Sequence, residues 1–290
     1  MPASIVRNVY VMSSGKLTVD GSTLVPGTSF GVPKTIPVQF FLLDTDKGYI
    51  LVDTGNDPDV ITDAVAAWGA DLAGAANPEM TSEHHPYEQL KLCGVEPSDV
   101  RMVIYTHLHH DHAGGGRFFP DALHVVQKAE HRWAFTPDTY FGRPYSQKDF
   151  RHDAMRWQLA EGDWVILPGV HLVSTPGHTP GHQSIVLWDT PSAGTVIIAG
   201  DAVNTRENIE CDIPPGLTTD TASAVGSLHR LTALAALTDA TMLVSHEQAF
   251  YAMLPKPPEP LRTLDPEVRR YWRANLAKVY RDAADPDSLI

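Results

Sequence analysis

The stretch Thr106-His107-Leu108-His109-His110-Asp111-His112 is the part of the sequence on which the rest of the interpretation depends. It follows the apolar run Val103–Tyr105, which predicts a buried strand, and it leads into Ala113-Gly114-Gly115-Gly116, which predicts a tight turn. Four potential metal ligands, His107, His109, Asp111 and His112, are therefore gathered at the end of one strand.

The residue types in this stretch indicate a catalytic metal site. Imidazole nitrogen and carboxylate oxygen are the ligands that divalent ions such as zinc prefer, and a catalytic ion needs about three of them plus an open position. His107 and His109 share a face of an extended chain, so both can bind one ion. Asp111 and His112 follow where the chain bends and are placed to hold a second ion, and two ions about 3.5–4 Å apart suit hydrolysis.

Three further potential ligands also stand at the ends of apolar runs. His178 follows the run His171–Ser174, Asp201 ends the run Ile197–Gly200, and His246 comes directly after Met242-Leu243-Val244-Ser245. An accidental surface cluster of histidines does not explain this repetition, because each ligand follows a strand signal. The sequence therefore predicts one metal centre built from loops at one edge of the fold.

The order of these residues resembles the pattern of metallo-β-lactamase-fold hydrolases: His-x-His-x-Asp-His, then a lone His, a lone Asp and a final His. The resemblance runs from about residue 37 to about residue 248. It implies a first ion held by His107, His109 and His178, a second held by Asp111, His112 and His246, and Asp201 bridging the two. It also implies that Asp53 orients the ligands rather than binding metal.

Within that superfamily the sequence is most similar to the N-acyl-homoserine lactone hydrolases, the quorum-quenching lactonases. The matching stretches are Thr106–Gly115, Glu161–Asp163 ahead of Pro168–Val170, Thr175–His178 with Gly181–Ser184, and Thr205–Asn208. In those lactonases and the similar pyridoxolactone hydrolases, a tyrosine that helps to polarise the substrate carbonyl stands three residues after the bridging aspartate. Here that position is Asn204, whose amide can donate a hydrogen bond but cannot act as an acid.

The expected fold is an α/β protein in which two sheets pack face to face with helices outside, the four-layer αβ/βα sandwich of the metallo-β-lactamase fold. This expectation rests partly on the resemblance, because the pattern alone also fits a doubly wound sheet. One domain over residues 1–290 is expected. Strands within residues 1–35 and a C-terminal helix over residues 265–282 are expected as peripheral additions.

Other local signals lead to more specific expectations. Two strands are predicted at the start, Ile5–Met12 and Lys16–Leu24, with a hairpin signal at Asp20-Gly21. Helices are predicted over Asp57–Trp68 and His84–Cys93, with a loop over Gly69–Ser82 between them. In the resembling lactonases, a loop at the position of Val25–Thr35 leans over the active site. The aromatic segment Thr136–Arg151 is either a small core of its own or the wall of a substrate pocket.

Composition limits the classes of partner and location. A net charge of −13, from 22 basic and 35 acidic residues, argues against nucleic acid as a partner. Two cysteines, Cys93 and Cys211, are too few for a disulfide scaffold. No apolar run approaches the roughly 20 residues of a membrane span, and Met1–Ile5 does not begin a secretory signal. A cytoplasmic protein without membrane contact is expected, as a monomer or a homodimer.

The expected function is a metal-dependent hydrolase that opens a lactone ring, with N-acyl-homoserine lactone as the expected substrate, by attack of a metal-bridging hydroxide. Asp111 is expected to orient the nucleophile and pass a proton to the ring oxygen, and Asn204 to contact the carbonyl. Two divalent ions are expected, Zn²⁺ first, with Mn²⁺, Fe²⁺ and Co²⁺ left open by these ligands. The alternative is a hydrolase of another cyclic or aryl ester or amide, or a thioesterase similar to glyoxalase II.

Overall fold

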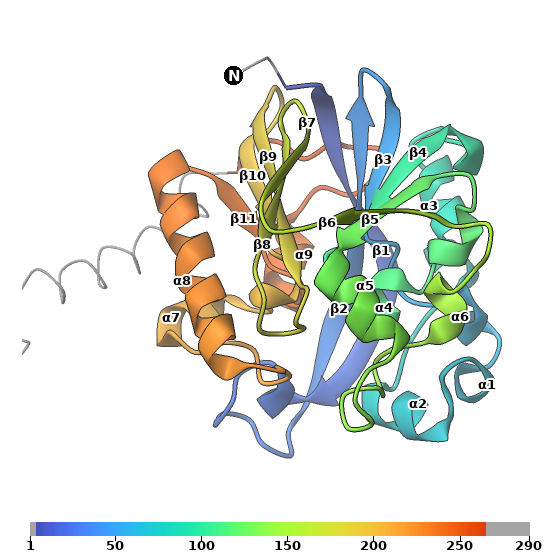
Figure 1. Cartoon of the computed structure of the whole chain (residues 1–290), viewed down its shortest axis with the longest axis vertical. Coiled ribbons are helices and arrows are strands. Elements are labelled where there is room, and N and C mark those ends of the chain that lie inside the picture. Colours follow the sequence, from blue (N-terminus) through green and yellow to red (C-terminus); the bar gives the residue numbers. More distant parts are fainter. Residues whose placement is uncertain (1–3, 265–290) are drawn as a thin grey trace, which may run out of the picture.

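A computed structural model describes residues 4–264 of the chain, and its first sheet contains six strands (Figure 1). Along the sheet these are β1 (Val6–Asp20), β2 (Pro33–Thr45), β3 (Gly48–Val52), β4 (Val100–Ile104), β5 (Leu123–Gln127) and β6 (Arg156–Ala160). The first three strands pair antiparallel, and the strands from β3 to β6 pair parallel. The spatial order of the strands therefore equals their order in the sequence.

The second sheet contains five strands in the order β11-β10-β9-β8-β7. Their bounds are β7 (Trp164–Leu167), β8 (Val170–Ser174), β9 (Gln183–Thr190), β10 (Gly194–Ile198) and β11 (Thr241–Leu243). The pair β10 and β11 is parallel, and the other pairs are antiparallel. The parallel pair brings the chain after β10 and the chain after β11 to the same edge, which is where Asp201 and His246 follow.

Helices lie on the outer faces of the two sheets (Figure 1). The helices of residues 4–264 are α1 (Ala64–Trp68), α2 (Ala70–Ala76), α3 (Pro86–Lys91), α4 (His110–Ala113), α5 (Lys128–Phe135), α6 (Gln147–Phe150), α7 (Arg206–Cys211), α8 (Thr221–Thr238) and α9 (Gln248–Met253). Not all of them lie on an outer face, since α9 contacts β2 and contributes Phe250 to the core that includes both sheets. Helix α8 packs on β10, while α3 and α5 pack on the first sheet. The layers are helix, sheet, sheet, helix, which confirms the expected αβ/βα sandwich.

Strand β2 shows how the sequence produces these layers. Successive side chains of a strand point to opposite faces, and β2 is apolar on both. Phe41 and Leu43 join the core that includes strands of both sheets, whereas Phe40 and Leu42 join the core under α3 and α5. All four side chains are almost completely buried. Burial on both faces makes the centre of the sandwich a rigid support for the loops at its edge.

The N-terminal region differs from the sequence-based prediction. A single strand, β1, replaces the two predicted strands, and an irregularity in its pairing with β2 lies between Ser13 and Lys16. Lys16 exchanges backbone hydrogen bonds with Glu79, so the distorted strand also contacts the loop before α3. The Asp20-Gly21 signal starts a longer connection instead of a two-residue hairpin turn, because the Asp20 side chain accepts from the Ser22 N–H and caps a 3₁₀ turn.

Other local predictions were also wrong. The predicted helix Asp57–Trp68 is interrupted, because the Asp63 side chain accepts from two backbone N–H groups and starts α1 afresh. The predicted loop over residues 69–82 contains α2. Strand β6 was not predicted, since as an edge strand it buries little apolar surface. The helix predicted over residues 265–282 lies outside the described residues. Among residues 4–264, no helix is both long and apolar enough to cross a membrane.

Candidate metal centre

All seven predicted ligand residues meet at one edge of the sandwich, and each is buried. His107 and His109 follow β4, and Asp111 and His112 lie in the short helix α4. The remaining three follow strands of the second sheet: His178 after β8, Asp201 after β10 and His246 after β11. Strand ends from both sheets therefore contribute to one cluster.

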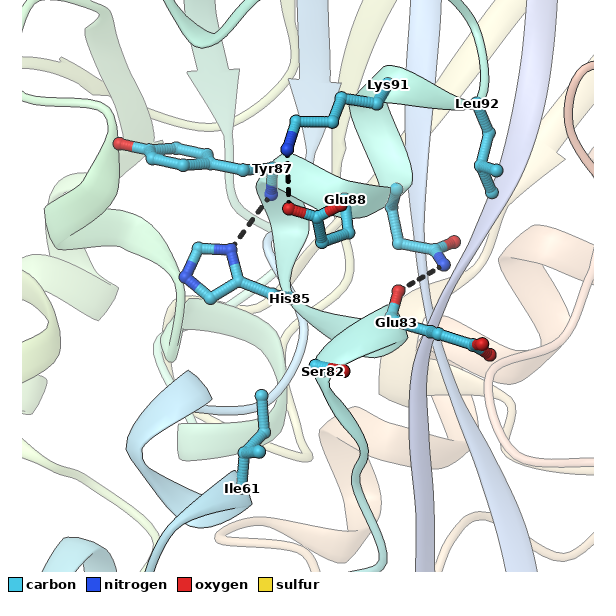
Figure 2. Close-up of a pocket in the computed structure, with 9 residues that line it drawn as sticks. Ile61, Ser82, Glu83, His85, Tyr87, Glu88, Lys91 and Leu92 are labelled. Atoms are coloured by element: carbon cyan, nitrogen blue, oxygen red, sulfur yellow. Dashed lines mark hydrogen bonds and ion pairs between the residues drawn. The ribbon is translucent and has the colours of Figure 1, made fainter.

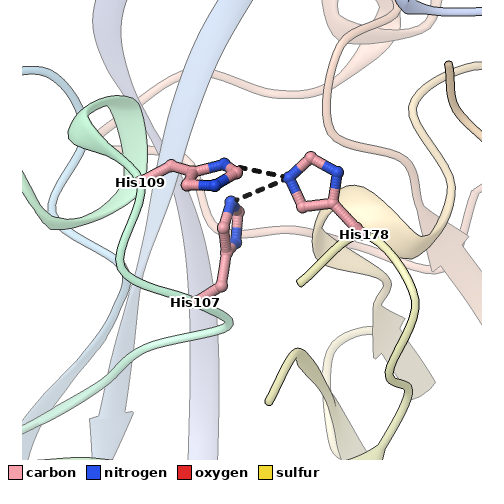
Figure 3. Close-up of side chains that lie close together, drawn as sticks. All are labelled: His107, His109 and His178. Carbon is pink, nitrogen blue, oxygen red and sulfur yellow. Dashed lines mark hydrogen bonds between the residues drawn. The ribbon is translucent and has the colours of Figure 1, made fainter. Parts of the chain in front are cut away.

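Three of the histidines form the first group of ligand atoms (Figure 3). The Nε2 atom of His178 lies 3.2 Å from Nε2 of His107 and 3.0 Å from Nδ1 of His109. In a tetrahedral site with metal–nitrogen bonds of about 2.0–2.1 Å, ligand atoms lie about 3.4 Å apart. A neutral imidazole carries a single N–H, so hydrogen bonds alone do not explain three converging nitrogens. The spacing fits a divalent ion.

The second group consists of Asp111, His112 and His246, with Asp201 between the two groups. Oδ2 of Asp111 lies 3.7 Å from Nε2 of His112 and 3.6 Å from Nε2 of His246. Oδ1 of Asp201 lies 3.2 Å and 3.3 Å from the same two nitrogens, whereas its Oδ2 lies 3.5 Å from Nε2 of His178. The two oxygens of Asp201 therefore face different groups.

Hydrogen bonds on the far side of the rings orient three of these histidines. Nδ1 of His178 donates to the Leu217 carbonyl at 2.5 Å, and Nδ1 of His246 donates to the Pro37 carbonyl at 3.0 Å. Nδ1 of His112 lies 2.8 Å from Oδ2 of Asp53. With Nδ1 used in this way, Nε2 of each ring presents its lone pair to the cluster.

Asp53 has the orienting position that the sequence suggested. Its carboxylate accepts from the backbone N–H and the hydroxyl of Thr106, at 2.7 Å and 2.8 Å, in addition to contacting His112. Its backbone has a φ of 59°, in the left-handed region that non-glycine residues rarely adopt. This strained residue directly follows β3 and ties it to the ligand-bearing loop after β4.

Burial and charge act differently on the two groups. Burial, together with the neighbouring imidazoles, lowers the pKa of His107 and of His109 well below the usual range of histidine, so the first group has the neutral rings that coordinate metal. In the second group Asp201 and Asp111 outweigh burial and raise the pKa of His112 and of His246, and these two rings in turn hold the pKa of Asp201 well below its usual value. A divalent ion bound there would take the place of the protons on these two rings.

Glu130 is a residue of this site that sequence reasoning missed. Its buried carboxylate accepts hydrogen bonds from the Leu108 N–H at 3.0 Å, the Thr179 hydroxyl at 2.6 Å and the Gly181 N–H at 3.3 Å. Leu108 lies between two ligand histidines and Thr179 follows a third, so one carboxylate joins the two loops that form the first group. No local pattern in α5 distinguishes this glutamate from an exposed one, because its partners are distant in sequence.

Gly181 explains why the loop that carries His178 packs so closely against α5. A Cβ atom at Gly181 would collide with the backbone of Glu130, so only glycine allows the loop after His178 to approach α5 this closely. The fourth partner of the carboxylate is Tyr145, whose hydroxyl donates at 3.1 Å and whose ring lies against His109. The first group is therefore supported from several sides.

A cavity of about 500 Å³ opens onto the cluster. Ligand residues of both groups and Asn204 form one part of its wall. Other lining residues are apolar, among them Leu17, Leu24, Ile36, Leu72 and Ala76. The aromatic segment of residues 136–151 contributes to this wall through Tyr140, Phe141 and Tyr145, and it forms no core of its own, because Phe150 joins the core under α3 and α5. The predicted loop 25–35 contributes its flanking residues Leu24 and Ile36 to this wall.

A wider hollow of about 910 Å³ lies elsewhere, beside α3 (Figure 2). Its polar groups pair with each other: Lys91 with Glu88 at 2.6 Å, and the Tyr87 N–H with Nδ1 of His85 at 3.1 Å. None of the seven clustered residues lines it. The larger volume therefore does not mark the candidate site, because five of the clustered histidines and aspartates line the smaller cavity.

The sequence as a whole matches a known family. The model of the Metallo-beta-lactamase superfamily matches residues 34–246, and the chain belongs to this superfamily. Among its relatives is N-acyl homoserine lactonase AttM of Rhizobium radiobacter, 33% identical over 257 residues, or 87% of this chain and 97% of AttM. N-acyl homoserine lactonase AiiA of Bacillus thuringiensis subsp. kurstaki is 34% identical over 209 residues, covering 72% of this chain and 81% of AiiA.

A solved structure gives the same result in three dimensions. An N-acyl homoserine lactone hydrolase with the product N-hexanoyl-L-homoserine bound at its catalytic metal centre is 31% identical, with a TM-score of 0.80 over 88% of this chain and 99% of that one. The predicted resemblance to these lactonases is confirmed. With the clustered ligands, this family membership defines the chain as a metal-dependent hydrolase with a divalent metal centre.

Proposed function

We propose that this protein opens the ring of N-acyl-homoserine lactones, using two divalent ions, Zn²⁺ first among them. The observation that carries the proposal is the seven-residue cluster, five members of which line a cavity that also has apolar lining residues. A small polar ring with an acyl tail fits such a cavity, with the ring at the cluster and the tail on the apolar side. The lactonase names of the relatives support the same substrate.

In this proposal His107, His109 and His178 would hold one ion, and Asp111, His112 and His246 would hold the other. Asp201 would contribute to both sites, because its two oxygens face different groups. When bound, the ions supply hydroxide near neutral pH and polarise the ester carbonyl. The protein's own part is to hold the ligands in place, through Glu130 on one side and Asp53 on the other.

Asp111 is proposed to transfer the proton. Its carboxylate lies among the ligand atoms and also lines the cavity, so it reaches the reacting ring from the side of the cluster. Hydrolysis adds water across the ester bond, so the proton that the attacking water loses has to reach the ring oxygen. Asp111 would accept this proton and deliver it to the alkoxide that ring opening leaves.

Asn204 is proposed to contact the substrate carbonyl in place of the tyrosine of the resembling lactonases. Its side-chain oxygen accepts from the Ser245 hydroxyl at 3.2 Å, which leaves the amide N–H groups as the donors available at the cavity wall. Its backbone is held by the Asn208 side chain at 3.1 Å and by the His246 N–H at 2.8 Å. The donor is thus fixed beside a ligand residue.

The experiment is a substrate panel combined with metal analysis. The purified protein is given N-hexanoyl-homoserine lactone, an unsubstituted γ-lactone, a thioester and a phosphodiester, and acid release is followed with a pH indicator. We expect two ions per chain, turnover of the lactones, loss of activity with a chelator, and recovery when Zn²⁺ is returned. Turnover of thioesters or phosphodiesters without lactones would refute the proposal.

A pair of variants tests Asn204. Asn204→Ala removes the donor and is expected to lower kcat by about tenfold, the value of one hydrogen bond of about 1.4 kcal/mol. Asn204→Tyr restores a donor of the kind that the resembling lactonases carry and is expected to recover part of that loss. If both variants match the unchanged protein in lactone turnover, Asn204 does not contact the reacting carbonyl.

A further inference from the structure

His110 lies between two proposed ligands, His109 and Asp111, but is not one of them. Its side chain is buried and lines the cavity beside His109 and Asp111. Neither ring nitrogen makes a hydrogen bond within the described part of the chain. Nδ1 lies 3.2 Å from a carboxylate oxygen of Asp111, but not in hydrogen-bonding alignment, and Nε2 is entirely without a partner.

Trp68 contributes a second unpaired polar atom at the same place. Its ring lies 4.3 Å from the ring of His110, centroid to centroid, and its Nε1 is buried without a hydrogen-bond partner in residues 4–264. Trp68 packs against the apolar cluster that includes Leu17, Leu24, Ile36 and Ala76, which also line the cavity. Trp68 does not line the cavity itself, so the polar patch that a substrate can reach consists of the ring of His110, with Trp68 packed against it.

A buried donor without a partner has an energetic cost of about 1–3 kcal/mol, so proteins rarely keep one without a reason. A phenylalanine at residue 110 would fill similar space and avoid that cost. Since His110 lines the substrate cavity, a substrate atom is able to supply the missing partner. A neutral imidazole has one N–H donor, so an acceptor atom of the substrate would pair with the N–H of His110.

We infer that His110, with Trp68 beside it, binds an oxygen atom of the substrate's acyl group and so selects acyl chains that present an oxygen there. This inference rests on the proposed lactonase function. The shared chemistry is a carbonyl or hydroxyl oxygen, supplied either by the amide carbonyl of every N-acyl chain or by an oxygen substituent on the third carbon of the chain. An apolar wall would bind the remaining tail.

The test compares His110→Phe with the unchanged protein on three lactones: γ-butyrolactone, N-hexanoyl-homoserine lactone and N-(3-oxohexanoyl)-homoserine lactone. We expect kcat/KM for γ-butyrolactone to remain within about twofold, and kcat/KM for the 3-oxo substrate to fall by about tenfold, the value of one hydrogen bond. An equal fall for both acylated substrates assigns the contact to the amide carbonyl. A fall confined to the 3-oxo substrate assigns it to the substituent.

Two controls separate a binding role from a structural one. Leu72→Ala removes apolar wall without a polar group, and it should lower turnover of both acylated lactones equally. Metal content per chain is measured for every variant. If His110→Phe loses metal and all three substrates slow together, or if no ratio between substrates changes, the inference is wrong.

Calorimetry separates failure of this inference from failure of the proposed function. Affinity for ring-opened N-(3-oxohexanoyl)-homoserine and N-hexanoyl-homoserine is measured without any turnover. A preference for the 3-oxo compound that is lost in His110→Phe, or an equal loss of both affinities, supports the polar patch even in a protein that turns over no lactone. Unchanged affinities for both compounds would contradict it. Absence of lactone turnover in the unchanged protein would count only against the proposed function.

Discussion

The clustered side chains and the wall of the cavity beside them differ in how they are held. Every clustered residue is buried, and each follows a strand of the two packed sheets or lies in α4 beyond β4. The wall combines buried residues of strands, such as Leu17 and Ile36, with residues of connecting segments, where Tyr140 is 83% exposed and Leu217 is 45% exposed. Ligand geometry has to be held within tenths of an ångström, whereas the wall has to accommodate a flexible chain.

Reactivity and substrate preference are therefore expected to depend on different parts of the chain. The ligands are held by partners that are themselves buried, such as Asp53 and Glu130, so reactivity depends on the rigid edge of the sandwich. Phe141 and Arg143 line the cavity from the segment between α5 and α6. The next two residues hold the cluster, because the Pro144 carbonyl accepts from the His110 N–H and Tyr145 contacts His109 and Glu130. A change in substrate preference without an effect on the cluster is therefore expected at Phe141 and Arg143 only. Substitutions in the two regions should therefore have separable effects.

The largest effect is expected for Asp201→Ala. This change removes the carboxylate that faces both groups, and it leaves the Nε2 atoms of His112 and His246 without their nearest carboxylate oxygen. We expect kcat/KM for the lactone to fall by about a thousandfold or more, with fewer than two ions bound per chain. Metal analysis and turnover check this. Asp212→Ala, at an exposed carboxylate paired with His229, is the matched control and should change neither.

A smaller effect is expected for Glu130→Gln. The side chain keeps its shape but loses one of the oxygens that accept from the loops around His109 and His178, so the first group should loosen. We expect metal affinity at one site to fall by about 10- to 100-fold, as for other changes in residues that support ligands. Titration of metal into the apoprotein measures it, and Glu88→Gln is the exposed control. Equal affinities for the two variants would show that α5 does not position the cluster.

Substitutions in the cavity wall should change the preference for the length of the substrate's acyl chain and should leave the hydrolytic step itself unaffected. Phe141→Ala removes an aromatic surface from the cavity, and we expect kcat/KM for N-decanoyl-homoserine lactone to fall by about tenfold while the N-butanoyl substrate is little affected. Tyr140→Ala, at the exposed neighbour, should have a weaker effect. An equal loss on both substrates would mean that Phe141 supports the centre and not the wall.

The smallest effect is expected on the free energy of unfolding, through a buried histidine in the first sheet. Burial lowers the pKa of His124 on β5 to about 4, and its ring bonds to the Tyr105 hydroxyl and the Phe119 carbonyl. Because this folded-state pKa lies below the unfolded value of about 6.5, the unfolded chain takes up a proton first as the pH falls. Stability should therefore decrease from about pH 6.5 to about pH 4, by up to about 3 kcal/mol from this group.

Thermal unfolding of the metal-free protein between pH 7.5 and pH 4.5 checks this expectation. His124→Gln keeps a hydrogen-bonding side chain without the titration, so its melting temperature should decrease less steeply with falling pH. Identical slopes for the two proteins would assign the acid sensitivity to other groups.

Much of the metal centre could be predicted from the sequence because its ligands follow strand signals. The runs before His107, Asp201 and His246 are short and apolar, and such runs are typical of strands that are buried on both faces. The resemblance then supplied the grouping of the ligands. Local elements were predicted less well where side chains interrupt or cap the backbone, as Asp63 does before α1 and the irregularity after Ser13 does within β1.

The sequence by itself determined the ligand types, their order, and the apolar strands that end beside them, since these depend on residues close together along the chain. Only the tertiary structure decided that Glu130 joins two ligand loops and that His110 meets Trp68 without a hydrogen-bond partner. Such contacts join residues that are distant in sequence, and whether a buried polar group is paired depends on how separate segments pack together.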